Sequence, residues 1–77
     1  MVQRCQTEVD RKLRSEIGAT NVSYTSGRAL AVNPKVTNVQ GETMVSMPRG
    51  PARQFTYFCS FLTEEGDRLT SAEYSPK

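Results

Sequence analysis

Hydrophobic side chains recur at helical spacing along the first seventeen residues. Five of them form the repeat: Val2, Cys5, Val9, Leu13 and Ile17. Spacings of three and four residues place such side chains on one side of an α-helix, and most positions between them are charged or polar. Gly18 follows the last of them, and glycine commonly ends a helix. The pattern therefore predicts an amphipathic helix over residues 2–17.

Beyond residue 18 the helical period is lost, and short alternating segments are separated by turn-forming residues. The predicted strands cover residues 21–25, 28–32, 36–47, 53–62 and 68–74. The first two form either a tight hairpin at Ser26 and Gly27 or one long strand with a bulge. Both readings are open because the large hydrophobic residues Val22, Tyr24, Leu30 and Val32 all stand at even positions. The sequence thus predicts four or five antiparallel strands.

The segment 53–62 shows the clearest alternation. Its odd positions carry side chains suited to a core face: Phe55, Tyr57, Cys59 and Phe61. Segment 36–47 has apolar side chains at the odd positions Val39, Val45 and Met47, and Gly41 lies on the same face. The missing side chain there predicts a bend or a bulky neighbour. Ala72 and Tyr74 are the expected inner residues of the last strand.

The helix and the strands need each other for stability. A single short helix is unstable alone, and a bare sheet would expose its apolar face to water. With 77 residues, 36% of them hydrophobic, the chain builds one thin core. Residues 1–77 are therefore expected to form a single α+β domain. In it, one N-terminal amphipathic helix packs on a four- to five-stranded antiparallel meander in two layers.

Two cysteines, Cys5 and Cys59, both point into the predicted core layer. A disulfide between them would staple a small domain and indicate an oxidising compartment. Two buried, reduced thiols in a cytoplasmic protein are the alternative. The first residues lack the apolar segment of a signal peptide, so a periplasmic or secreted location presumes that a leader was removed.

The composition narrows the chemistry that the chain can perform. It has no histidine, the usual acid–base residue at neutral pH, and its two cysteines do not have the spacing of a zinc or redox motif. Glu64 and Glu65 are neighbours in a predicted turn, so nothing makes them face each other across a substrate. No apolar run approaches the length of a membrane span. The expectation is a non-enzymatic domain without a metal or cofactor.

A net charge of +2 implies no strong attraction to nucleic acid. Residues 53–60 resemble the octapeptide of RNA-recognition motifs, in which aromatic residues alternate after a basic one. However, Gln54 and Thr56 stand where that motif has small residues, and Ser60 replaces its last aromatic residue. The aromatic face is also needed beneath the helix. These features argue against nucleic-acid binding, and a cytosolic nucleic-acid-binding module is kept as the alternative function.

A pattern spread along nearly the whole chain resembles small exported bacterial proteins of uncharacterised function. It consists of an early helix cysteine, a Val-x-Gly element, a Phe-x-Tyr-x-Cys strand, a turn glycine and a terminal-strand tyrosine. In this chain these are Cys5, Val39 to Gly41, Phe55 to Cys59, Gly66 and Tyr74. The resemblance implies a periplasmic or secreted setting and a disulfide between the two cysteines. It implies no particular activity.

Three surfaces are candidates for binding another protein. If the odd positions face the core, Met44, Phe58 and Leu62 lie on the outer face of the sheet among polar residues, a setting typical of partner sites. The loop of residues 48–52 contains two prolines, and Arg49 within it and Arg53 directly after it can present guanidinium forks to carboxylates. An edge strand open to β-augmentation is the third. The sequence favours a protein-interaction module outside the cytosol.

Overall fold

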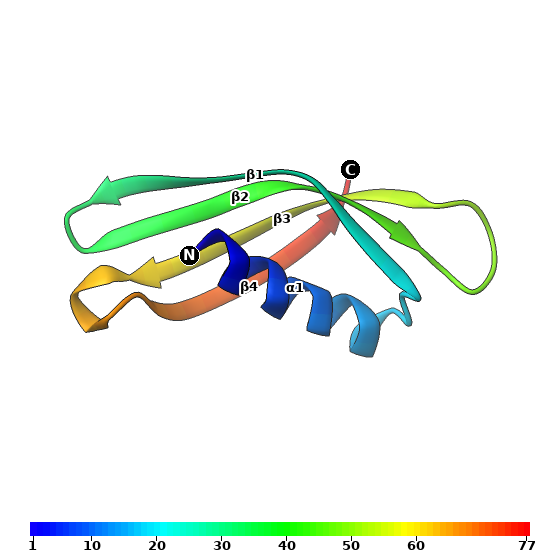
Figure 1. Cartoon of the computed structure of the whole chain (residues 1–77), viewed down its shortest axis with the longest axis horizontal. Coiled ribbons are helices and arrows are strands. Elements are labelled where there is room, and N and C mark those ends of the chain that lie inside the picture. Colours follow the sequence, from blue (N-terminus) through cyan, green and yellow to red (C-terminus); the bar gives the residue numbers. More distant parts are fainter.

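The computed structural model describes all 77 residues and contains one α-helix and four strands (Figure 1). In chain order the elements are α1 (Val2–Glu16), β1 (Asn21–Asn33), β2 (Val36–Ser46), β3 (Arg53–Leu62), the short 3-10 helix η1 (Thr63–Glu65) and β4 (Arg68–Pro76). The strands form one antiparallel sheet in the order β1-β2-β3-β4, and α1 packs on one of its faces. The predicted two-layer α+β meander is confirmed.

Helix α1 is held on the sheet by its apolar side chains. Cys5, Val9 and Leu13 are fully buried and belong to the same hydrophobic core as the odd positions of β3. Lys12 also ties the helix to the sheet, because its Nζ donates a hydrogen bond to the Ala72 carbonyl oxygen of β4 at 2.7 Å. The helix therefore depends on tertiary packing for its stability, as expected for one of fifteen residues.

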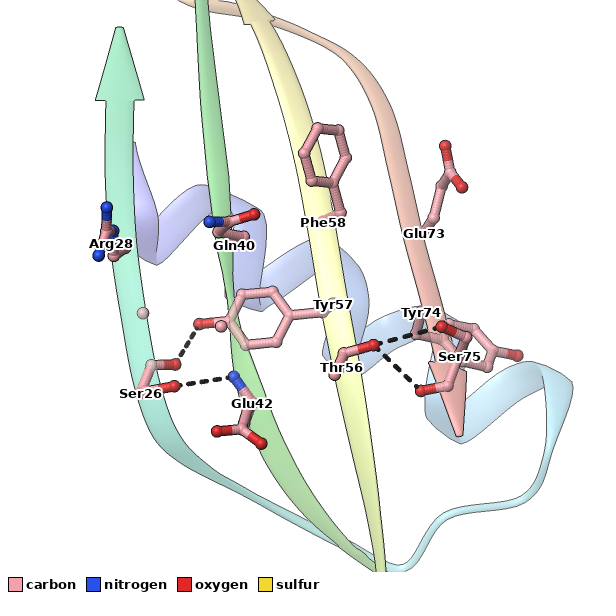
Figure 2. Close-up of a pocket in the computed structure, with 12 residues that line it drawn as sticks. Ser26, Arg28, Gln40, Glu42, Thr56, Tyr57, Phe58, Glu73, Tyr74 and Ser75 are labelled. Carbon is pink, nitrogen blue, oxygen red and sulfur yellow. Dashed lines mark hydrogen bonds between the residues drawn. The ribbon is translucent and has the colours of Figure 1, made fainter. Parts of the chain in front are cut away.

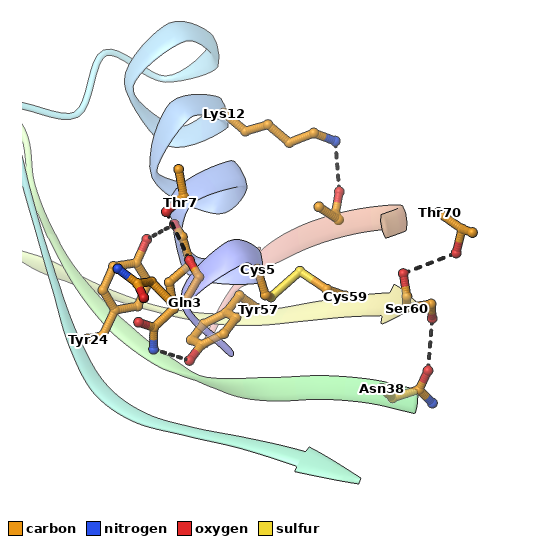
Figure 3. The surroundings of a disulfide bond; sticks show 12 residues. Gln3, Cys5, Thr7, Lys12, Tyr24, Asn38, Tyr57, Cys59, Ser60 and Thr70 are labelled. Carbon is orange, nitrogen blue, oxygen red and sulfur yellow. Dashed lines mark hydrogen bonds between the residues drawn. A yellow bond between two sulfur atoms is a disulfide. The ribbon is translucent and has the colours of Figure 1, made fainter. Parts of the chain in front are cut away.

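A disulfide bond joins the two layers inside the core (Figure 3). Cys5 of α1 and Cys59 of β3 are fully buried, and their Sγ atoms lie 2.10 Å apart. The bond connects residues separated by 54 positions, and closing a loop of this length stabilises a fold by ~4 kcal/mol in the chain-entropy description. Of the two predicted alternatives, the structure contains the disulfide and no free thiol.

Strand β1 is one long strand and not a hairpin. It pairs with β2 from Asn21 to Asn33, with a register shift between Ala31 and Asn33 and a bulge directly after Tyr24. This bulge reverses the alternation, so that Tyr24 packs against the core whereas Leu30 and Val32 are 50% and 56% exposed. Of the two readings that the sequence leaves open, the structure contains the bulged strand, and the extra residue turns the following side chains to the opposite face.

Gly41 of β2 lies directly opposite Tyr57 of β3 on the core side of the sheet. The Tyr57 side chain reaches across the glycine, and its hydroxyl donates a hydrogen bond to the Ser26 carbonyl oxygen of β1 at 2.7 Å. The same hydroxyl accepts a hydrogen bond from Gln6 of α1 at 2.9 Å, and Tyr24 packs edge-on against the ring (Figure 3). The bulky neighbour predicted for Gly41 is therefore Tyr57.

The molecule is elongated, with extents of 43 × 19 × 16 Å. The β1–β2 and β3–β4 turns lie at one end, and the β2–β3 loop lies at the other, beyond the C-terminal end of α1 (Figure 1). The surfaces that the sequence suggested for partner binding therefore fall in different parts of the molecule.

Candidate functional site

Side chains on the sheet face opposite α1 are aligned in rows across the strands (Figure 2). The register pairs Arg28 with Gln40, Gln40 with Phe58, and Phe58 with Glu73, so these four form one row. The adjoining row consists of Ser26, Glu42, Thr56 and Ser75. Apart from Phe58, both rows are polar or charged. These two rows therefore offer many hydrogen-bonding groups around a single apolar side chain.

A shallow hollow of about 600 Å³ lies over these two rows. Within it the hydroxyl oxygens of Thr56 and Ser75 are 3.2 Å apart and bond to each other. Arg28 and Glu73 stand at opposite ends of their row, and neither forms an ion pair within the chain. The hollow thus has a free positive group at the β1 side and a free negative group at the β4 side.

The three apolar residues predicted for a partner site share this face but lie apart along it. Phe58 is half-buried in the first row, and Leu62 lies four residues further along β3. Met44 is 37% exposed and lies four residues from Gln40, the partner of Phe58, in the opposite direction. At about 3.3 Å per residue, each is displaced from Phe58 by ~13 Å along the strands. They do not form one continuous patch.

Seven of the ten basic side chains have a partner within the chain. Those seven are Arg4, Arg11, Lys12, Arg14, Lys35, Arg68 and Lys77. Arg28, Arg49 and Arg53 contact neither a carboxylate nor a carbonyl oxygen. A guanidinium group without an internal partner is free to bind an external anion. These three arginines therefore mark where the domain can hold a negatively charged group.

Arg49 and Arg53 flank one cleft of about 440 Å³ beside the β2–β3 loop. The cleft is further lined by Ile17, Met47, Pro48, Gly50 and Pro51. Ile17 and Met47 pack against the hydrophobic core, and no acidic side chain reaches the lining. The Cζ atom of Arg53 lies 6.0 Å from the centre of the Phe55 ring, a cation–π contact that orients the guanidinium and leaves its charge uncompensated.

The two edge strands of the sheet differ in protection. Strand β4 contains an arginine, a glutamate and a proline among its nine residues. In addition, its Ala72 carbonyl oxygen already accepts a hydrogen bond from Lys12. Strand β1 has one charged residue, Arg28, among thirteen and no proline, and residues 25–33 are all exposed. Charge and proline discourage an edge strand from pairing with another chain. The accessible edge is therefore that of β1.

The sequence predicts an open edge strand but does not identify it as β1 or point to Arg28. The ambiguity between a hairpin and a bulged strand left it open which residues lie on the edge. A usable signal was nevertheless present, because Arg28 is the only charged residue between Glu16 and Lys35. An isolated charge on an exposed strand either limits pairing at that edge or favours a partner of opposite charge.

The aromatic residues at the odd positions of β3 are inaccessible to a ligand. Phe55, Tyr57 and Phe61 are at most 4% exposed, because α1 covers them. Residues 53–60 therefore cannot form a platform on which bases stack, and Phe58 is the one aromatic side chain of β3 on the open face.

Two tyrosines between the helix and the sheet have raised pKa values. Burial, with a smaller contribution from the negative charge of Asp10, raises the pKa of Tyr24 to about 12. Tyr74 donates a hydrogen bond to the Glu16 carboxylate at 2.7 Å, and this contact is the main reason that its pKa is raised. Both shifts favour the neutral phenol and reflect how α1 packs on the strands.

Comparison with protein-family models, curated proteins and solved structures finds no match for this chain. No group of three His, Cys, Asp or Glu side chains is placed to hold a metal ion. The one α-helix is too short and too polar to cross a bilayer. A function must therefore be inferred from the exposed surfaces of the chain itself.

Proposed function

We propose that this chain is a non-enzymatic protein-interaction module that works outside the cytosol and binds an extended segment of its partner along β1. The observation that carries the proposal is the exposed edge at residues 25–33, which no other element covers. An edge strand of this kind can accept a further strand through main-chain hydrogen bonds. The disulfide between Cys5 and Cys59 supports the compartment, because such bonds persist in oxidising environments.

The side chains of β1 indicate what the partner segment should contain. Arg28 lies on the outer face and has no anion within the chain, so an acidic side chain on the added strand would complete a cross-strand ion pair. Leu30 is next on the same face and is 50% exposed, which favours an apolar side chain two positions from the acidic one. A segment with acidic and apolar side chains at alternate positions therefore fits this edge.

A second copy of the chain fits the edge less well. If the exposed stretches of two β1 strands overlapped fully in an antiparallel pair, Arg28 of each copy would face Leu30 of the other, and the two Arg28 side chains would be diagonal neighbours on one face of the sheet. Like charges near each other across strands are unfavourable. A different protein with an acidic residue close to Arg28 is therefore the better fit to this edge.

Selection from a random peptide library tests this proposal. Nine-residue peptides, matching the nine exposed residues 25–33, are displayed on phage and selected on the immobilised, oxidised domain. We expect enriched peptides to alternate acidic and apolar residues, because alternate side chains of an added strand lie on one face. Fluorescence anisotropy should show that Arg28→Glu weakens their binding several-fold and that Leu30→Lys weakens it as well.

The matched control is Glu73→Lys, which changes a charge at the other end of the same row. This variant should bind the selected peptides as the unchanged domain does. If Glu73→Lys weakens binding as much as Arg28→Glu, the peptide occupies the hollow of the outer face and not the β1 edge. If selection enriches no peptide, the proposed edge pairing is wrong.

A further inference from the structure

The cleft beside the β2–β3 loop is separate from the β1 edge. Most of its lining comes from the β2–β3 loop, which lies at the opposite end of the long molecule from the β1–β2 turn (Figure 1). Two of the three arginines without an internal partner, Arg49 and Arg53, line this single cleft. Their juxtaposition without any neighbouring carboxylate makes the cleft a place where the chain can bind an anion.

The loop that carries Arg49 is restrained before any ligand binds. Pro48 and Pro51 fix their own φ angles, and Gly50 between them adopts a left-handed φ of 92°, which lets the chain turn there. The second arginine, Arg53, is restricted by the contact of its guanidinium group with the Phe55 ring. Restrained groups lose less conformational entropy on binding than freely moving ones.

The lining indicates the kind of anion. Arg49 and Arg53 can donate paired hydrogen bonds to a planar carboxylate, whereas Ile17 and Met47 offer an apolar wall next to them. Inorganic phosphate would gain nothing from that wall. A carboxylate attached to an apolar side chain would bury the side chain and neutralise the two charges together.

We propose that this cleft binds the free C-terminus of a polypeptide whose last residue is apolar. The terminal carboxylate lies between the guanidinium groups of Arg49 and Arg53, and the last side chain packs against Ile17 and Met47. This site is independent of the β1 edge, so either can exist without the other. Together they would let the domain hold two separate parts of its partners.

A peptide titration followed by NMR tests the cleft. The probe is N-acetyl-glycyl-glycyl-leucine with a free carboxylate, added to the complete, oxidised, isotope-labelled chain. We expect saturable shifts at the amides of Met47 to Arg53 and at Ile17. The same peptide with a C-terminal amide should bind about tenfold more weakly, because it lacks the charge that strengthens hydrogen bonds to arginine.

Three variants test whether the peptide binds in this cleft or is held by non-specific attraction to positive charge. Arg49→Gln and Arg53→Gln should each weaken binding of the carboxylate peptide by about tenfold. Arg28→Gln removes the third unpaired arginine and should leave the affinity unchanged. All three positions are exposed, so we expect the variants to remain folded, which thermal melts will check.

Three results would overturn the proposal. Equal binding of the amide peptide would show that the carboxylate is not recognised. Inorganic phosphate binding as tightly as the peptide would show a site for any anion, without use of the apolar wall. Absence of saturable shifts at Met47 to Arg53 in the low-millimolar range would show that no such site exists.

Discussion

The Tyr57 side chain occupies the space in which Gly41 lacks a side chain. A Cβ atom added at residue 41 would lie 2.6 Å from the Tyr57 hydroxyl oxygen and would also collide with the Ser26 carbonyl oxygen. The hydroxyl in turn bonds β1 and α1 through Ser26 and Gln6. A glycine on β2 and a tyrosine on β3 together allow three strands and the helix to be linked at one point.

Gly41→Ala should therefore destabilise the domain by about 1–3 kcal/mol, the cost typical of overpacking, because one of the colliding atoms belongs to the backbone. Chemical denaturation measures the change. The control is Gln40→Ala, one residue away on the outer face, which should change stability by no more than ~0.5 kcal/mol. Equal effects of the two substitutions would mean that Tyr57 does not lie across Gly41.

The disulfide should contribute to stability through the long loop that it closes. Replacing Cys5 and Cys59 together by alanine should lower the free energy of unfolding by ~4 kcal/mol, given their separation of 54 residues. Unreduced, folded protein treated with an alkylating reagent should gain no mass, since both sulfurs are bonded and buried. Rapid labelling of both thiols under these conditions would contradict the bond.

Much of the fold follows from the sequence because its periodicities are strong. The spacing from Val2 to Ile17 predicts the helix, and the odd positions of β3 predict the core face and the direction of Cys59. The path of β1 could not be predicted, because its apolar residues show the same parity with or without a bulge. Only pairing with β2 reveals the extra residue after Tyr24, which sends Leu30 to the opposite side.

The candidate site was less predictable than the fold. Sequence parity places Met44, Phe58 and Leu62 on one face, but their distances depend on the register between β2 and β3. Whether Arg49 and Arg53 have a partner within the chain likewise depends on which acidic side chains lie near them in space. The distances between the apolar residues and the set of residues that line the cleft both arise from tertiary structure. Neither can be predicted from local sequence patterns.

The two faces of β3 should respond differently to truncation. Phe55→Ala removes a side chain that is 4% exposed and should cost about 3–5 kcal/mol of stability. Phe58→Ala, on the half-buried outer side, should cost clearly less, because no second layer covers that face. Thermal melts of both variants check this difference. Equal loss would show that the outer face is covered, for example by a second protomer.

Alkaline pH should weaken the domain through Tyr24. Its pKa is about 12 in the folded state and near its ordinary value of 10.0 in the unfolded chain. The contribution of the neutral Tyr24 phenol to folding stability is therefore complete below pH 10.0. It is lost as the pH rises toward 12, because only the unfolded chain releases the tyrosine proton in that interval.

Ultraviolet absorbance at high pH follows the ionisation of the tyrosines. Tyr24→Phe should remove the component that titrates near pH 12 and reduce the fall of stability above pH 10.0. A phenol signal from Tyr24 at its ordinary pKa would show that the side chain is not buried between α1 and β1.

Amide hydrogen exchange of the domain, with and without a saturating amount of the tightest library peptide, tests the β1 edge most directly. An added strand should slow exchange at alternate residues of 25–33, those whose N–H groups point away from β2, and leave β4 unchanged. Unchanged exchange across residues 25–33 in the saturated complex, or protection at β4 instead, would contradict binding along β1.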